Sequence, residues 1–141
     1  MSIDSNDQWS LKQVQPKDSP EQWFFRKNLA PGVSPGDPQY PYIAFLTFSY
    51  SPRDESGLPS TSDEEILFRV EDEEIACLET NSLSVQVASV LKSGIKDMLF
   101  YTRDPEQFLR IAETFRNRYP EFKVSCEIGK DAKWEQYEDF P

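Results

Sequence analysis

The chain has 141 residues, of which 38 % are hydrophobic and 13 % aromatic, and it carries a net charge of −10 without any histidine. This length fits one domain with a single core, and the apolar content is well above that of a disordered, highly charged chain. The lack of histidine excludes a Ser–His or Cys–His catalytic triad, a histidine–carboxylate iron site and a Cys₂His₂ zinc site.

The sequence contains no membrane or secretion signal that we can identify. No apolar run approaches the ~20 residues of a membrane helix, and Met1–Asp7 lacks the basic and apolar segments of a signal peptide. We therefore expect a cytoplasmic protein that does not bind membranes. Cys77 and Cys126 have no CxxC spacing and no histidine nearby, so we expect buried, reduced thiols.

Residues 1–30 are predicted to form an N-terminal β-hairpin. Trp9 and Leu11 alternate with polar residues, as in a strand, and the aromatic segment Trp23–Asn28 supplies a second strand. A helix over residues 21–29 is the competing prediction, because no residue in that range forbids it.

The middle of the chain is predicted to form a loop, a strand and an acidic helix. Four prolines and two glycines make residues 31–41 a loop. Tyr42–Tyr50 is β-prone and apolar on nearly both faces, which is typical of a central strand. A helix over residues 63–79 follows, with Ser62 and Glu65 as a predicted capping box.

Two further strands and a helix are predicted next. The strands Val85–Leu91 and Ile95–Tyr101 flank a hairpin turn at Ser93-Gly94. Asp104 precedes a proline and stands three residues before Gln107, which predicts the N-terminus of a helix that ends before Pro120.

The C-terminal elements complete a recognisable order. The alternating segment Phe122–Ile128 is predicted as a half-buried strand, and Asp131 as the cap of a short turn within residues 130–141. Residues 42–129 thus read as a βαββαβ core. We expect a single α+β domain, residues 1–141, of ferredoxin-like split βαβ type, with two helices on one face of an antiparallel sheet.

Three short motifs carry a resemblance to a known family: Gly57-Leu58-Pro59, Lys96–Thr102, and Asp131–Trp134 together with Tyr137. The chain resembles the bacterial family of unknown function numbered 695, with Lys96-Asp97 where an Arg-Glu pair is expected. That family has no assigned activity, so the resemblance implies no catalytic residue and no cofactor. The chain is also similar to the ribonuclease E inhibitor domain called regulator B, which implies a regulator that binds a protein.

The acidic charge is concentrated in one segment. Residues 61–80 contribute −7 to the net charge, and seven carboxylates lie between Asp63 and Glu74. Such a surface repels nucleic-acid phosphates and attracts cationic partners. We expect a basic protein partner and no direct nucleic-acid binding, with Glu71, Asp72 and Glu73 as outward-facing binding residues.

One carboxylate of this helix is predicted to lie near the core. On a regular helical wheel Glu74 falls inside the apolar arc, and shifting the arc toward Phe68 and Ile75 places Glu71 inside it instead. Glu74 is therefore our candidate for a buried carboxylate, unless the helix kinks or Glu74 pairs with an arginine. No second carboxylate is placed to assist catalysis, and acids at consecutive helix positions point around the axis, which argues against a metal site.

These observations predict a non-enzymatic, acidic regulatory domain that binds a basic partner through its acidic helix. A simpler alternative is a solvated helix face that only keeps the protein soluble. An alternative of another class is a small-molecule-binding or hydrolase domain with its pocket between the 31–41 loop and the sheet.

Overall fold

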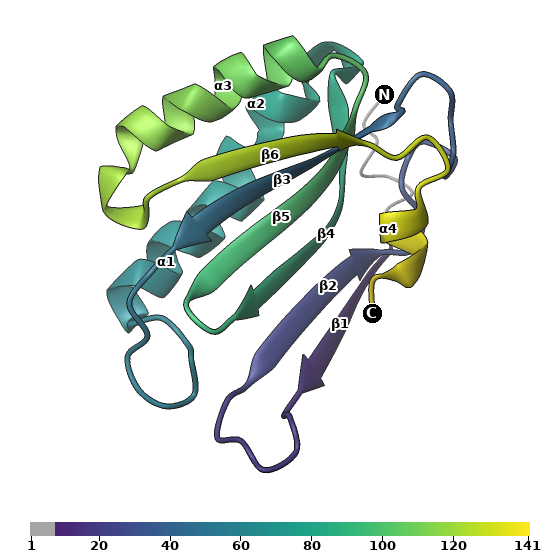
Figure 1. Ribbon diagram of the computed structural model, residues 1–141. Coiled ribbons are helices and arrows are strands. Elements are labelled where there is room, and N and C mark those ends of the chain that lie inside the picture. Colours follow the sequence, from purple (N-terminus) through teal and green to yellow (C-terminus); the bar gives the residue numbers. More distant parts are fainter. Residues whose placement is uncertain (1–7) are drawn as a thin grey trace.

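The structure is a computed structural model that describes residues 8–141. Its centre is one antiparallel sheet of six strands in the order β1-β2-β4-β5-β3-β6 (Figure 1). The strands are β1 (Trp9–Val14), β2 (Trp23–Asn28), β3 (Tyr42–Ser49), β4 (Ser84–Lys92), β5 (Ile95–Thr102) and β6 (Ser125–Lys130). The chain therefore has the predicted α+β class.

The N-terminal hairpin widens the sheet beyond β4. Trp9 pairs with Asn28 and Val14 with Trp23, while β2 also pairs with β4. The competing helix over residues 21–29 is wrong, because Trp23–Asn28 form a strand that pairs with β1 on one side and β4 on the other. Residues 31–41 contain no helix or strand, as predicted from their prolines.

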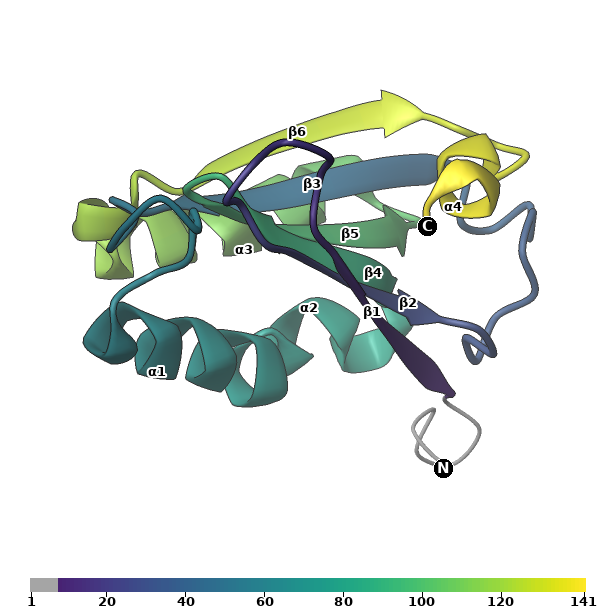
Figure 2. The same ribbon diagram turned by 90° about the horizontal axis from the view of Figure 1, so that it is seen from below.

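The helical segments before β4 and between β5 and β6 lie on one face of the sheet (Figure 2). They are α1 (Thr61–Arg69), the π-helical turn η2 (Val70–Glu74), α2 (Ala76–Glu79) and α3 (Pro105–Arg118). Leu67, Val70 and Leu78 of the first three elements and Phe115 of α3 pack into one core with the β3 residues that face the helices, such as Phe48. This core accounts for the apolar alternation of β3.

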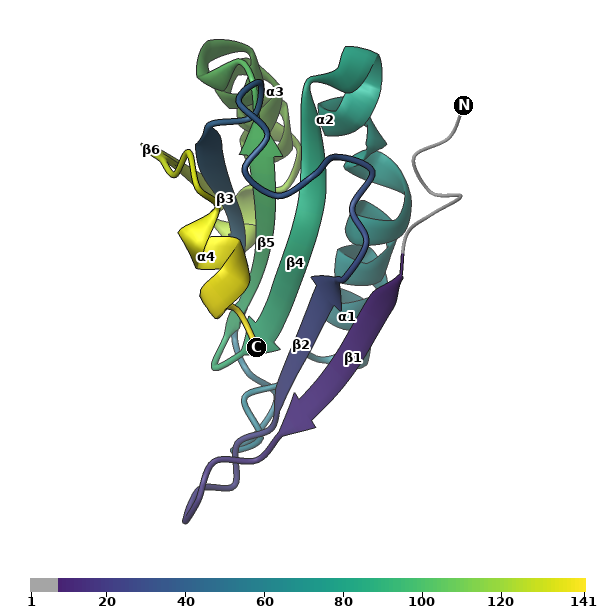
Figure 3. The ribbon, with the colours of Figure 1, turned by 90° about the vertical axis from the view of Figure 1, so that its right-hand side faces the viewer.

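The opposite face carries a smaller core beneath the short helix α4 (Glu135–Asp139), which Figure 3 shows beside the sheet. The ring of Tyr101 stacks on Trp134 with centroids 4.0 Å apart, and the indole nitrogen of Trp134 donates to the carbonyl of Tyr40 at 2.9 Å. Asp131 accepts from the Tyr101 hydroxyl and from the first two amides of α4, as predicted for a cap.

The predicted N-cap of α3 is in place, whereas that of α1 is not. Asp104 accepts from the amide of Gln107 at 3.1 Å, as predicted. The cap at Ser62 is wrong, because Ser60 accepts from the amide of Asp63 at 3.2 Å and the helix begins at Thr61. Ser60 has the extended backbone that an N-cap requires, with φ −61° and ψ 162°.

The last strand begins later than predicted. Pro120–Phe122 form a 3₁₀ turn, and Lys123 has a left-handed backbone with φ 46°. The ladder with β3 therefore starts at Ser125 rather than Phe122, and it extends to Lys130.

The two cysteines are free thiols, but their environments differ. Cys126 is partly buried, which raises its thiol pKa to about 12. Cys77 is exposed, so the prediction of two buried thiols is wrong for this residue. It lies in α2 directly before Leu78, which takes the core position.

Candidate functional site

The acidic segment of the chain distributes its carboxylates over three environments. Glu71 is only 5 % exposed, so the prediction that it points outward is wrong. Asp72 and Glu73 are exposed, in agreement with the sequence. Glu74, the predicted candidate for a buried carboxylate, keeps 18 % of its side chain exposed.

The π turn η2 explains this distribution. The amide of Ile75 donates to the carbonyl of Val70, five residues earlier, at 3.0 Å. The turn therefore holds one residue more than an α-helical turn, and a regular helical wheel no longer applies after Val70. As a result Glu71 contacts residues of the sheet, whereas Glu74 contacts residues of α3.

Glu71 belongs to a group that we call the Glu71 ion cluster: Arg26, Glu71, Gln86 and Lys96. Its Oε1 lies 2.6 Å from Lys96 Nζ and 2.7 Å from Arg26 Nη1, and its Oε2 accepts from the Gln86 amide at 2.8 Å. Burial alone would raise the pKa of Glu71, but the two cations outweigh it and hold that pKa below its usual value. The carboxylate is therefore charged at neutral pH.

A bulge in β4 places the amide of Gln86 in this cluster. The register with β5 shifts between Gln86 and Ala88, so that Gln86 pairs with Phe100 and Ser89 with Met98. In an unbroken strand an even and an odd position lie on opposite faces, whereas the extra residue brings both to the helix face. Gln86 then reaches Glu71 from the sheet.

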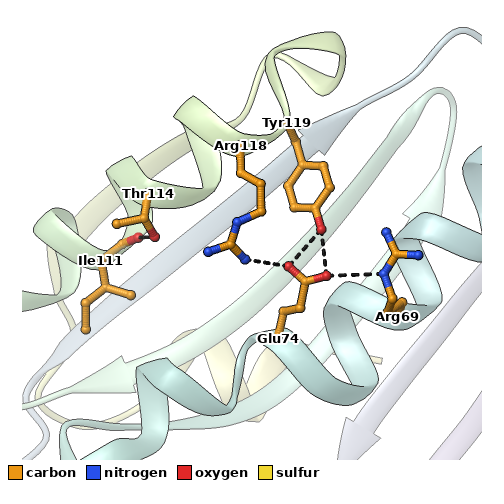
Figure 4. A network of polar contacts seen from close by, with 6 residues as sticks. All are labelled: Arg69, Glu74, Ile111, Thr114, Arg118 and Tyr119. Carbon is orange, nitrogen blue, oxygen red and sulfur yellow. Dashed lines mark hydrogen bonds and ion pairs between the residues drawn. The ribbon is translucent and has the colours of Figure 1, made fainter.

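Glu74 forms a second group, the Glu74 cluster, which links η2 to α3 (Figure 4). It accepts from Arg118 at 2.7 Å, from the Tyr119 hydroxyl at 2.6 and 2.7 Å, and from Arg69 at 3.3 Å. Burial opposes its charge, but these donors together lower the pKa of Glu74. The predicted alternative, in which this glutamate pairs with an arginine, is what the structure contains.

Beside the Glu71 ion cluster lies an open cleft of about 720 Å³, which we call the hairpin cleft. The N-terminal hairpin and α1 both contribute side chains to its walls. Its walls are formed by Trp9, Leu11, Phe24, Arg26, Arg53, Leu58, Pro59, Glu64, Phe68, Asp72, Leu91 and Lys96. Leu11 is 77 % exposed and Phe68 48 % exposed, so the rim presents large apolar side chains to solvent.

The polar groups of the cleft are arranged by depth. Lys96 has a side chain only 4 % exposed, whereas that of Arg53 is 45 % exposed. Arg26 packs its guanidinium 4.8 Å from the centre of the Trp9 ring, in cation–π geometry. The Lys96 ammonium and the Arg26 guanidinium thus lie among apolar walls. Glu64 of α1 and Asp72 of η2 also line the cleft.

The cleft is not where the sequence placed a pocket. A smaller recess of about 280 Å³ adjoins it between Arg26 and η2, and two other pockets lie between α3 and β6 and beside β6 and α4. None of these four has a wall formed by residues 31–41. Tyr40 and Val33 of this loop belong to the smaller core with Trp134, on the face of the sheet opposite to the helices, which explains the different location.

Within residues 8–141, no three Cys, Asp or Glu side chains are grouped so as to hold a metal ion. No helix in that same range is both long and apolar enough to cross a membrane.

Comparison with known proteins places the chain in a family. A family model described as a family of unknown function, DUF695, matches residues 7–140. The chain belongs to the DUF695 family. No curated protein and no solved structure matches it, and the further similarity to regulator B stays a prediction.

The motifs that suggested DUF695 membership occupy structural positions on both sides of the sheet. Leu58 and Pro59 form part of the cleft wall, and the carbonyl of Gly57 accepts from the Tyr50 hydroxyl at 2.6 Å. Asp131 and Trp134 attach α4 to the opposite face. One motif therefore shapes the candidate site and another holds a distant element.

Lys96 is the residue of the candidate site that the sequence analysis missed. Lys96, Met98 and Phe100 alternate in β5 and all face the helices. A lysine in phase with two core residues was a visible signal of a buried ammonium, since lysine is almost never fully buried without a partner. Its partner Glu71 was weighed only as the alternative to Glu74 inside the apolar arc, because a regular helical wheel does not include the π turn that rotates Glu71 inward.

Proposed function

We propose that this DUF695 chain is a binding domain that takes a small amphipathic molecule into the hairpin cleft. The observation that carries the proposal is the cleft itself, whose volume of about 720 Å³ and largely apolar walls with a few polar groups are typical of ligand sites. The site belongs to the predicted alternative class of small-molecule-binding domains, at a different place in the fold.

The finer description of the fold supports this location. We propose that β3, β4, β5 and β6, with their two helical connections, form a ferredoxin-like core in the order β4-β5-β3-β6. The N-terminal hairpin is then an addition to that core. It extends the sheet past the helical layer and so leaves Trp9, Leu11 and Phe24 beside α1 rather than beneath it.

Truncating the apolar rim tests the proposal. We expect Leu11→Ala and Phe68→Ala each to weaken binding of 1-decanol about three- to tenfold, because each removes apolar contact area from the ligand. Binding is measured by NMR titration of the labelled protein, at concentrations below those at which the alcohol aggregates.

Leu109→Ala is the matched control, because Leu109 is also exposed but lies on α3, away from the cleft. The control should bind 1-decanol as the wild type does. Equal affinities for all four proteins, or no binding to the wild type, would refute the hairpin cleft as the ligand site.

A second function, capture of a basic protein partner, is favoured by a separate observation. Asp72 and Glu73 are exposed, and neither forms an ion pair with any other residue in the range 8–141. Their charges are not neutralised internally as those of Glu71 and Glu74 are. We propose that these two acids, without Glu71, form the electrostatic contact.

Charge reversal tests this second function. The variant Asp72→Lys/Glu73→Lys should lose salt-sensitive capture of a basic partner from lysate, since complementary charge steers association. Glu121→Lys/Glu138→Lys changes the net charge equally at exposed positions elsewhere and should retain it. If both variants capture the same proteins as the wild type, the acidic segment has no role in partner binding.

A further inference from the structure

We infer that the hairpin cleft selects amphipathic carboxylates, with the Lys96 ammonium as the group that receives the ligand's carboxylate. This inference rests on the proposed function, since it names the chemistry of the ligand for the same cleft. The ligand class is a monocarboxylic acid with an extended apolar body.

The Lys96 ammonium has more hydrogen-bond donors than the described protein groups use. An ammonium carries three N–H donors and cannot accept. The side chain is 4 % exposed, and the one acceptor bonded to it among residues 8–141 is Glu71 Oε1. Two donors of a buried cation are thus left without a protein partner, while Lys96 forms part of the cleft wall. A buried polar group in this condition favours a ligand acceptor.

Two cations, Lys96 and Arg26, lie together in the wall of the cleft. Lys96 and Arg26 both contact the same oxygen of Glu71, so two cations share one carboxylate. A structural ion pair would need only one of them. A second carboxylate, brought by the ligand, would match the two cations and could accept from both.

The same cleft also contains two acidic side chains. Glu64 and Asp72 also form part of its wall and oppose an anion. Asp72 is exposed and Glu64 partly exposed, so water and salt screen their charges more strongly than that of the buried Lys96. Leu91, which pairs with Lys96, and Phe24, which pairs with Leu91, are apolar walls that lower the local dielectric and strengthen a contact with the ammonium.

The apolar body of the ligand has a defined place. Phe24 and Leu91 are neighbours across the β2–β4 ladder, and Leu91 is paired with Lys96 across β4–β5. The three side chains therefore form one row on the helix face of the sheet, with the ammonium at one end. An extended chain that lies along this row reaches the exposed Leu11 and Phe68 at the rim.

The experiment compares three ligands of equal chain length on the full chain: decanoate, 1-decanol and decyltrimethylammonium. Dissociation constants are measured by NMR titration at pH 7, below the aggregation limit of each ligand. We expect decanoate to bind at least about tenfold more tightly than 1-decanol, because only decanoate brings a negative charge to Lys96, whereas the alcohol offers a neutral acceptor. The ammonium ligand should bind most weakly, because it has no acceptor and carries the same charge as Lys96.

Two variants assign this preference to the cations of the Glu71 ion cluster. In Glu71→Gln/Lys96→Met, made in an Arg26→Gln background so that neither cation that contacts Glu71 remains, decanoate and 1-decanol should bind within about twofold of each other. Lys123→Met removes an exposed lysine near α3 and should keep the wild-type preference.

The outcomes separate the inference from the function on which it rests. If decanol and decanoate bind the wild-type cleft equally, the carboxylate inference is wrong while the proposed function stands. If none of the three binds, both fail. Because the comparison of ligands needs only the wild type, it decides the matter even if the triple variant does not fold.

Discussion

At the scale of single residues, the decisive feature is that two glutamates of one acidic segment are neutralised by different neighbours. Glu71 meets Lys96 and Arg26 from the sheet, and Glu74 meets Arg118 and Tyr119 from α3. Asp72 and Glu73, the two acids between them, are exposed. The chemistry of each carboxylate therefore depends on its partners and not on its residue type.

The Glu71 ion cluster leads to a prediction about stability. Glu71→Gln leaves the buried Lys96 ammonium without its counter-charge and should lower the free energy of unfolding by about 3–5 kcal/mol. Glu71→Gln/Lys96→Met should recover most of that loss, because no unpaired buried charge remains. Glu73→Gln, at an exposed site, should change stability by no more than about 0.5 kcal/mol.

Urea unfolding monitored by tryptophan fluorescence measures all three variants. A double variant that is no more stable than Glu71→Gln alone would show that the destabilisation does not arise from the charge of Lys96.

At the scale of elements, local signals and distant contacts contribute differently to what could be predicted. The start of α3 was predictable because Asp104 and Gln107 are three residues apart and interact directly. The π turn η2 was not, since the contacts that favour it come from β2, β5 and α3. The β4 bulge was not predictable either. It shifts the register with β5 between Gln86 and Ala88, and no residue type in that segment marks the shift.

The Glu74 cluster joins two such elements and predicts a pH effect. The pKa of Glu74 is lower in the folded chain than its ordinary value of 4.5. Its contribution to stability is therefore fully present above that value and is lost as the pH falls through the lower folded pKa. We expect the urea midpoint of the wild type to decrease below about pH 4.5, and that of Glu74→Gln to decrease less.

The same titration with Asp72→Asn serves as the control. Asp72 is exposed and forms no ion pair with any other described residue, so its removal should leave the acid-side slope unchanged. A Glu74→Gln profile parallel to that of the wild type would show that the cluster does not contribute to acid sensitivity.

At the scale of the whole molecule, the sequence predicted the fold class better than the site. The hairpin of β4 and β5 follows from a short connection, and the helical layer follows from apolar periodicity, whereas the pairing of β3 with β5 and β6 joins strands that are far apart in the chain. The cleft depends on a hairpin of moderate strand signal, on α1 and on Lys96, which are brought together only by tertiary packing. The acidic charge predicted a binding surface on the helix itself, whereas the cleft lies between that helix and the hairpin.

The most direct test of the cleft as a ligand site is a co-crystal structure of the wild-type chain with decanoate. We predict the alkyl chain between the N-terminal hairpin and α1, with a carboxylate oxygen about 2.7–2.9 Å from Lys96 Nζ. Decanoate bound elsewhere on the surface, for example between α3 and β6, with the hairpin cleft empty, would contradict the proposal.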